Sequence, residues 1–563
     1  MRPENWPHTC KDRAVPSTLF TRSTTWVAVF TAAALIVASC SITTDNLDNM
    51  AINDDRAVAA TSPPTIDDLD TDDLDTDDLD TDDPASGDEP RPDEARPDGP
   101  SADAGSAGEP TPDADELESA ADAATIGADG AGDSYYPTYG NGGYDVLNYD
   151  ITFDWDDGER SIDAETTLSL VATQSLTQFN IDLIGFDISA ISINGEAADF
   201  SRQDRELIIR PATPLTEGEA ADVVIAYAGR PSPITGIGFP FAGGWTDFGD
   251  TVVVAGEPEG AAGWYPVNAH PIDKATYRIE VTAATDLVVA ANGTQTSVTD
   301  NGDTRTWVYE SVNPQAHYLT TVAIGDFIPH EGEPSASGVP IRHFFHESAF
   351  DESVATMERT GQMIDAFEEL YGPYPFENYG AVVVDADLGF ALETQTLSVF
   401  GRDLVDSFAS RENIVAHEVA HQWFGNDVSL TQWSDIWLNE GFASYSEYLW
   451  RAASEPGYDI DLAVRSDYES LVFLLDSPPA APPPDDLFNG SVYLRGGFTL
   501  HALRITIGDD AFFQLLRTYV DEFGGGNALT RDFTALAEDI SGQDLGDFFQ
   551  AWLYEEQVPL MPR

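Results

Sequence analysis

The stretch "NIVAHEVAHQWFG", Asn413 to Gly425, contains residue types that could bind a metal ion and use it for hydrolysis. His417 and His421 are four residues apart, so a helix would place both imidazoles on one face, one turn apart. That spacing lets both rings reach one tetrahedral zinc, while Glu418 points beside the metal at its bound water. The five-residue pattern is weak evidence alone, because two histidines can also share a helix face by chance.

Glu440 is a candidate third ligand, in "WSDIWLNEGFASYSEYLW". It lies 19 positions after His421, near the start of a second predicted helix. A zinc held by two histidines and one glutamate keeps its fourth position open for water, which is the catalytic arrangement. Asp435 lies just before this segment. It is either an acid that orients a zinc-bound imidazole or a surface or capping acid, and the sequence favours neither.

Helical periodicity surrounds these residues and predicts the domain that positions them. Ser410 is a candidate N-cap for a helix running to Phe424, with Gly425 just past its end. Upstream, "SVATMERTGQMIDAFEELYG" repeats apolar residues at helical spacing and ends at a glycine, and the strand-like "AVVVDAD" follows. Residues 346–563 are therefore predicted to form a mixed, helix-rich domain.

Residues 134–345 show a two-residue period instead. "NYDITFDW" and "SIDAETTLSL" alternate apolar and polar residues, and Gly, Asn and Asp turns separate such runs. This pattern predicts a mostly antiparallel β domain. His343 and His346, in "IRHFFH", are three residues apart and so lie on opposite faces of a strand. We interpret both as structural.

Residues 1–40 read as a signal peptide with a lipobox. Basic residues precede the apolar run "WVAVFTAAALIVAS", which is shorter than the ~20 residues that a membrane helix needs. "VASC" then resembles a bacterial lipobox, which implies cleavage before Cys40 and its lipidation. The alternatives are an ordinary secretory signal or a short anchor. Each version places the rest of the chain outside the cytoplasm, and the lipobox version anchors it to the bacterial cell membrane.

Residues 41–133 are predicted to be a disordered acidic linker. They hold 29 acids and 3 arginines, and "DDLDT" occurs three times in succession. Such sequence cannot bury enough apolar surface to fold. We favour a spacer over a weak calcium site, because the glycine turns and closing glutamate of a calcium loop are missing. Residues 134–563 are also acidic, with a net charge of -49, which argues against nucleic acid as a partner.

Four segments together resemble the zinc aminopeptidases of the aminopeptidase N family: "HEVAHQWFGN", "WLNEGFA", "GFALETQT" and "VYLRGGFTLHALR". The resemblance covers residues from about 134 to 563. It implies an α+β fold, with an N-terminal antiparallel β saddle domain followed by a thermolysin-like, helix-rich zinc metallopeptidase domain. It also implies one Zn2+ per chain, held by His417, His421 and Glu440, with Glu418 as the general base.

The same resemblance implies roles for three further residues. Tyr493, in "SVYLRGG", matches the family tyrosine that donates a hydrogen bond to the tetrahedral oxyanion. Glu393 matches the glutamate that binds the free α-ammonium group of the substrate. Glu257, in "AGEPEGAAGWYP", matches a second acid that contacts the amine from the β domain. The alternative readings are a packed aromatic for Tyr493 and a turn acid for Glu257.

This chain departs from the family pattern around Glu393. Phe390, Leu392 and Thr394 stand where the family has glycine, methionine and asparagine, which puts the shape of the neighbouring subsites in question. The large helical C-terminal domain of many family members is expected to be absent, because the chain ends 70 residues after Tyr493. That absence would leave the cleft more open.

The leading hypothesis is a lipid-anchored, extracytoplasmic zinc aminopeptidase that acts on peptides. A second hypothesis is an endopeptidase or epoxide hydrolase that uses the same zinc site. A third is a catalytically inactive cell-surface binding protein. Glu393 favours amine recognition over endopeptidase activity, and the complete set of catalytic residue types argues against an inactive protein.

Overall fold

The computed structural model describes residues 125–235, 243–405 and 411–563. The predicted signal peptide with Cys40, nearly all of the predicted linker and the candidate N-cap Ser410 lie outside these ranges. Within the described ranges, no helix is both long enough and apolar enough to cross a membrane.

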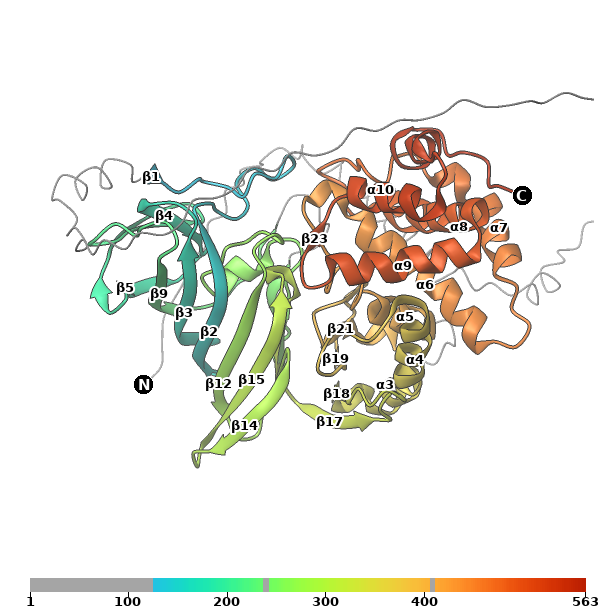
Figure 1. The fold of residues 1–563 in the computed structure, drawn as a ribbon. Helices are drawn as coiled ribbons and strands as arrows, with labels where there is room; N and C mark the ends of the chain where they lie inside the picture. The colour runs from blue at the N-terminus through green and yellow to red at the C-terminus, as the bar shows by residue number, and fades with distance from the viewer. Residues whose placement is uncertain (1–124, 236–242, 406–410) are drawn as a thin grey trace, which may run out of the picture. The chain divides into compact units, whose positions relative to one another are not determined.

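The N-terminal half of the described chain is β-rich, and its largest sheet has eight strands (Figure 1). Neighbouring strands are antiparallel except β2 and β12, which pair in parallel. The alternation seen in the sequence buries Tyr149, Ile151 and Phe153 on one face. In sheet order, the strands are β14 (Thr294–Asp300), β15 (Thr304–Gln315), β12 (Ala275–Ala284), β2 (Tyr144–Asp156), β3 (Ser161–Ala172), β9 (Ala220–Gly229), β5 (Asp187–Ile193) and β6 (Glu196–Ala197).

Two four-stranded sheets complete this half. The first, in sheet order, is β1 (Thr125–Ile126), β4 (Leu176–Asp182), β8 (Glu206–Arg210) and β7 (Asp199–Gln203). The second is β10 (Gly244–Asp247), β11 (Thr251–Ala255), β16 (Val322–Gly325) and β13 (Val288–Ala291). One apolar core, rich in aromatic side chains, joins residues from all three sheets.

The predicted linker ends too late. Thr125 and Ile126 already pair with β4, and the buried Asp133 accepts hydrogen bonds from the backbone N–H of Tyr136 (2.9 Å) and Trp433 (2.8 Å). The ordered fold therefore includes residues 125–133. Their Gly- and Ala-rich sequence gives no apolar pattern that would predict order. They are held in place by backbone pairing and one buried carboxylate instead of by apolar side chains.

The predicted boundary between the two domains, at 345/346, also needs correction. In sheet order, a five-stranded sheet is formed by β17 (Phe327–Gly332), β18 (Ile341–His346), β19 (Ala381–Val384), β21 (Ser398–Gly401) and β20 (Ala391–Leu392). The strands β17 and β18 thus belong to the second half, and the boundary falls near Asp326. Alternation in sequence identifies a strand but not its partner.

The helices of the second half are α3 (Phe350–Met357), α4 (Thr360–Tyr371), α5 (Arg411–Ala420), α6 (Trp437–Ser454), α7 (Ile460–Leu471), α8 (Gly496–Ile507), α9 (Asp509–Phe523), α10 (Thr530–Ser541) and α11 (Gly546–Phe549). Short 3-10 and π turns flank several of them, including η6 (Trp433–Asp435), η8 (Ser491–Arg495) and η9 (Gln550–Tyr554). The predicted α+β class, a β-rich half followed by a helical half, is confirmed. The expected absence of a further C-terminal domain stays a prediction.

Two helix predictions differ from the structure. The single helix expected before Gly372 is broken between Met357 and Thr360 into α3 and α4. The helix expected to reach Phe424 ends at Ala420, after which the chain forms tight turns. The backbone N–H of His421 still donates to the carbonyl of His417 at 3.2 Å, so the one-turn spacing of the two histidines persists.

Glycine contact lets two helices cross closely beside the predicted site. A Cβ atom added at Gly441 would lie 2.9 Å from the Cα of Gly496, so α6 and α8 meet backbone to backbone. Gly441 directly follows Glu440, and Gly496 follows η8, which carries Tyr493. The crossing therefore brings two predicted site residues together.

The β-rich half contacts the turn that follows α5. Lys274 Nζ donates to the backbone carbonyls of Asn426 (2.9 Å) and Asp427 (2.8 Å). The hydroxyl of Tyr318 donates to the carbonyl of Gly425 at 3.3 Å. These bonds fix the chain directly after His421 against residues from the β-rich half.

Candidate metal centre

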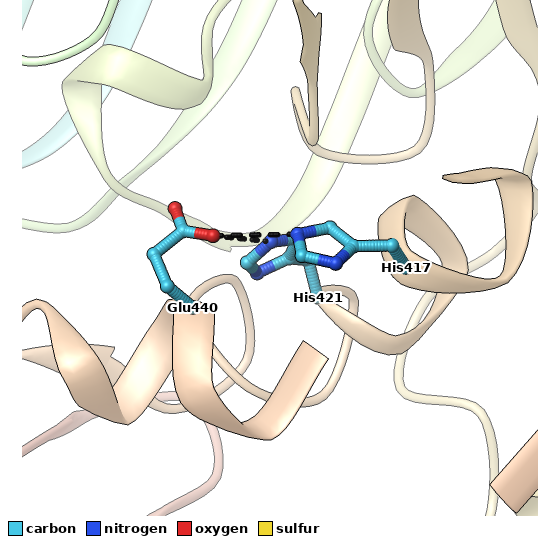
Figure 2. A group of neighbouring side chains, drawn as sticks. All are labelled: His417, His421 and Glu440. Carbon is cyan, nitrogen blue, oxygen red and sulfur yellow. Dashed lines mark hydrogen bonds and ion pairs between the residues drawn. The ribbon is translucent and has the colours of Figure 1, made fainter. Parts of the chain in front are cut away.

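The helix α5, the turn that follows it and the helix α6 carry the three predicted metal ligands. His417 lies in the last turn of α5, His421 follows that helix, and Glu440 lies in the first turn of α6. Both imidazoles point toward the Glu440 carboxylate (Figure 2). Glu440 Oε2 lies 3.3 Å from His417 Nε2 and 3.5 Å from His421 Nε2. All three side chains are buried, so the polar atoms face one another in a largely dry environment.

The spacing of these donor atoms fits a zinc ion. Tetrahedral zinc with N and O ligands has bonds of about 2.0–2.2 Å, which places neighbouring ligand atoms about 3.3–3.6 Å apart. The separations of Glu440 Oε2 from the two Nε2 atoms, 3.3 and 3.5 Å, agree with that edge length. Two histidines and one carboxylate also form a donor set that zinc prefers. The residues present therefore fit the metal that the sequence implies.

Glu418 is close to the three ligands but is not one of them. Burial raises the pKa of its carboxyl to about 8, and the neighbouring imidazoles oppose that rise. One of its oxygens, Oε2, is buried without a hydrogen-bond partner. A buried carboxylate with a free oxygen beside the ligand trio is placed to accept a proton, and the raised pKa makes it a stronger base.

Hydrogen bonds from outside the ligand trio set the orientation of both imidazoles. His417 Nδ1 lies 3.0 Å from Glu447 Oε1, and His421 Nδ1 lies 3.0 Å from the backbone oxygen of Phe424. Each bond fixes the ring so that Nε2 faces Glu440. Glu447 is not among the residues predicted from the sequence, although a signal exists: it lies seven residues after Glu440, two turns along the same face of α6.

Asp435, which the sequence left open between two roles, has a structural one. Its Oδ1 accepts a hydrogen bond of 2.6 Å from the Thr530 hydroxyl, which ties η6 to the start of α10. His343 and His346 also lie away from the ligand trio. His343 Nδ1 accepts from the backbone N–H of Ala381 at 3.1 Å, and His346 caps the turn at Ser348. Both histidines are structural, as the sequence predicted.

Tyr493 lies against the metal ligands on the π-helical turn η8. Its ring is nearly parallel to that of His417, with centroids 6.3 Å apart and an interplanar angle of 22°. Burial raises the pKa of the Tyr493 phenol well above its ordinary value, and the nearby Glu440 and Glu257 add to the effect. The phenol therefore keeps its proton and remains a hydrogen-bond donor.

Glu257 and Glu393 converge on the same place from different halves of the chain. Glu257 follows β11, Glu393 follows β20, and both are buried. Glu257, Glu393 and Glu440 each offer a carboxylate oxygen within 4.8 Å of the others. One oxygen each of Glu257 and Glu393 is buried without a hydrogen-bond partner, and burial raises the pKa of both carboxyls. Buried acids in such a group favour a cation between them.

Comparison with known proteins agrees with this geometry. The peptidase M1 N-terminal domain matches residues 146–319, and the peptidase family M1 domain matches residues 355–552. A crystal structure of an M1 zinc metallopeptidase from Deinococcus radiodurans is 30% identical, with a TM-score of 0.71, and the match covers 77% of this chain and 99% of that one.

The chain belongs to the peptidase M1 family. The sequence-based assignment to this family of zinc metallopeptidases, which are hydrolases, is thereby confirmed. Aminopeptidase N of Streptomyces lividans is 28% identical over 305 residues, and aminopeptidase N of Oryctolagus cuniculus is 28% identical over 333 residues. The matches cover 50% and 53% of this chain but only 35% and 34% of those proteins, so the chain spans about a third of their length.

Proposed function

We propose that this M1 family member is a zinc aminopeptidase that removes N-terminal residues from peptides. One observation carries the proposal: the carboxylates of Glu257, Glu393 and Glu440 converge beside the two histidines. The unpartnered oxygens of Glu257 and Glu393 suit the α-ammonium group of a peptide, which is a cation with three donors. Holding that group fixes its distance from the scissile bond. A mutant form of the Deinococcus radiodurans enzyme has been solved with a Tyr-Ser-Ala substrate, which supports a peptide ligand.

In the proposed mechanism, His417, His421 and Glu440 hold one Zn2+ per chain. Zinc held by these three residues would lower the pKa of a water and polarise the scissile carbonyl. Glu418 accepts the proton of that water and passes it to the leaving amine. The Tyr493 hydroxyl donates a hydrogen bond to the oxygen that gains negative charge. The buried position of Glu418 and the proximity of Tyr493 to His417 support these two roles.

Two other functions use the same residues and are tested beside the first. An endopeptidase or epoxide hydrolase would need no α-ammonium site, so it would leave the carboxylate oxygens of Glu257 and Glu393 that lack a hydrogen-bond partner without a ligand. A catalytically inactive binding protein would not need Glu418 and Tyr493 beside a complete ligand trio. The aminopeptidase accounts for all of these groups together.

The test measures hydrolysis of a panel of aminoacyl-arylamides by the full chain. Wild type is run beside Glu418→Gln and a chelated sample, and each substrate is also offered with an N-acetyl group. Release of arylamine only from free-amine substrates, lost in both controls, supports the aminopeptidase. Equal release from acetylated substrates indicates an endopeptidase. No release with one zinc per chain points to an unusual substrate, and no release without zinc points to a binding protein.

We also propose that Cys40 anchors the chain to the outer side of a bacterial cell membrane. Its support is the "VASC" lipobox after a short apolar run and the acidic, low-complexity sequence that follows. Phase separation of cell extracts in a mild detergent tests the anchor. We expect wild type in the detergent phase and Cys40→Ala in the aqueous phase. Wild type in the aqueous phase would favour an ordinary secretory signal.

A further inference from the structure

The turn that follows Glu393 contains an unusual backbone conformation. Thr396 has φ = 65°, in the left-handed region, although its side chain is β-branched. Such a residue is an outlier that persists only where its surroundings over-determine it, and such outliers gather at functional sites. Residues 394–396 are completely buried. The strain therefore lies within three residues of the carboxylate that we propose binds the substrate amine.

Hydrogen bonds from the β-rich half hold this turn. The Thr396 hydroxyl accepts a hydrogen bond of 2.7 Å from the backbone N–H of Gly293, which follows β13. Asn292 Nδ2 donates to the backbone oxygen of Gln395 at 2.6 Å. The same Asn292 amide donates to Leu319 and accepts from the N–H of Thr321, so it is itself fixed.

A second set of bonds holds the turn from the metal-ligand side. Gln422, next to His421, accepts from the backbone N–H of Thr396 (3.0 Å) and donates to the backbone oxygen of Glu393 (3.2 Å). Asn426 Nδ2 donates to the same Glu393 oxygen at 2.7 Å. One side-chain amide thus spans the turn from end to end. The backbone of Glu393 has little freedom to move relative to the metal ligands.

We propose that Thr396 is a positioning residue for amine recognition, an inference that rests on the proposed aminopeptidase function. Of the two carboxylates assigned to the amine, Glu257 belongs to the β-rich half and Glu393 to the other half. The bond from Gly293 to the Thr396 hydroxyl joins the Glu393 turn to the half that carries Glu257. It thereby holds the two carboxylates at one separation, which a small ammonium group requires. Thr396 adopts its strained conformation because this hydrogen bond requires it.

Thr396→Val tests this role, because it keeps the shape and the β-branch but removes the acceptor for the Gly293 N–H. Thr396→Ser keeps the hydroxyl and is the rescue variant. Thr166→Val is the matched control, since Thr166 is equally buried and its hydroxyl bonds to the Tyr227 hydroxyl at 3.1 Å within the β-rich half. Each protein is assayed on leucine p-nitroanilide and on its analogue without the α-amine.

The expected readout is the ratio of kcat/KM between the two substrates. We expect Thr396→Val to lower that ratio about tenfold, chiefly through a higher KM for the amine substrate, because one buried hydrogen bond is lost. Thr396→Ser and Thr166→Val should stay near wild type. If Thr396 has only a structural role, Thr396→Val should lower kcat/KM for both substrates equally and leave their ratio unchanged. That result overturns the proposal.

Hydrogen–deuterium exchange gives a readout that needs no turnover. Backbone amides of residues 393–397 should exchange faster in Thr396→Val than in wild type. In Thr166→Val the same amides should exchange at the wild-type rate. Unchanged exchange in Thr396→Val overturns the proposal even where the ratio falls. If wild type hydrolyses no free-amine substrate of the aminoacyl-arylamide panel, the aminopeptidase proposal fails, while exchange still reports whether Thr396 holds the turn. If Thr396→Val does not fold, Thr396→Gly, which relieves the left-handed strain but also lacks the hydroxyl, takes its place with the same expectations.

Discussion

Nδ1 of His417 lies 3.0 Å from Oε1 of Glu447, a residue two helical turns beyond Glu440 on α6. One helix thus supplies both a predicted zinc ligand and the carboxylate that orients another ligand. Carboxylates of this kind fix the tautomer of the imidazole and raise its basicity toward the metal.

Replacing Glu447 with glutamine should therefore weaken zinc binding about 10- to 100-fold while the fold is retained. Competition with a chromogenic chelator measures the change. Glu455→Gln is the matched control, because that half-exposed carboxylate on the C-terminal side of α6 pairs with Arg451 and not with a ligand. Equal zinc affinity in wild type and Glu447→Gln would contradict the assignment.

Zinc should also stabilise the folded chain. Buried carboxylates surround the ligand trio, and a cation offsets their mutual repulsion. A ligand that binds only the folded state adds about 2.7 kcal/mol to the free energy of unfolding when its free concentration is 100 times its Kd. Thermal unfolding of the chelated protein, before and after zinc is restored, should show a clear rise in Tm. His421→Asn should lose that rise, and a rise of equal size in this variant would indicate zinc bound elsewhere.

Arg495, two residues after Tyr493, is expected to contribute strongly to the free energy of unfolding. Its buried guanidinium donates to five backbone carbonyls, including those of Trp552 (2.8 Å) and Ala551 (3.0 Å) in η9. Arg495→Met leaves these carbonyls without their donor, so we expect a loss of at least about 3 kcal/mol in the free energy of unfolding. Urea denaturation measures it. Arg517→Met, which removes one exposed hydrogen bond to Leu370, should change stability by far less.

His343 should make the fold sensitive to acid. Burial lowers its pKa to about 3, so the folded chain keeps the ring neutral while the unfolded chain binds a proton below about pH 6.5. Between those values the unfolded state holds more protons, and stability falls as pH falls, by about 1.4 kcal/mol per pH unit.

The variant His343→Asn tests that contribution. Its amide oxygen can still accept the hydrogen bond from Ala381, but it does not titrate. Between pH 7 and pH 5, the loss of unfolding free energy in urea should be about 2 kcal/mol smaller than in wild type. An equal loss in both proteins would show that burial does not hold His343 neutral.

The sequence alone identified what depends on local spacing. A helix repeats every 3.6 residues, so His417 and His421 had to share a face once the segment was helical. Alternation along single strands likewise determined which residues of β2 and β3 face the core. The assignment of Glu440 as a ligand depended on the resemblance of the segment around it to a known family, because a separation of 19 residues does not by itself place two side chains together.

Only the tertiary structure decided which distant segments meet. Glu257 and Glu393 converge because long-range packing of two sheets brings their loops together, and no local period encodes that. The same holds for β17 and β18, whose alternation was visible but whose partner strand was not. The left-handed Thr396 is the sharpest case. Its intrinsic preference opposes the observed conformation, which is held by the hydrogen bond that its hydroxyl accepts from Gly293 and the one that its N–H donates to Gln422.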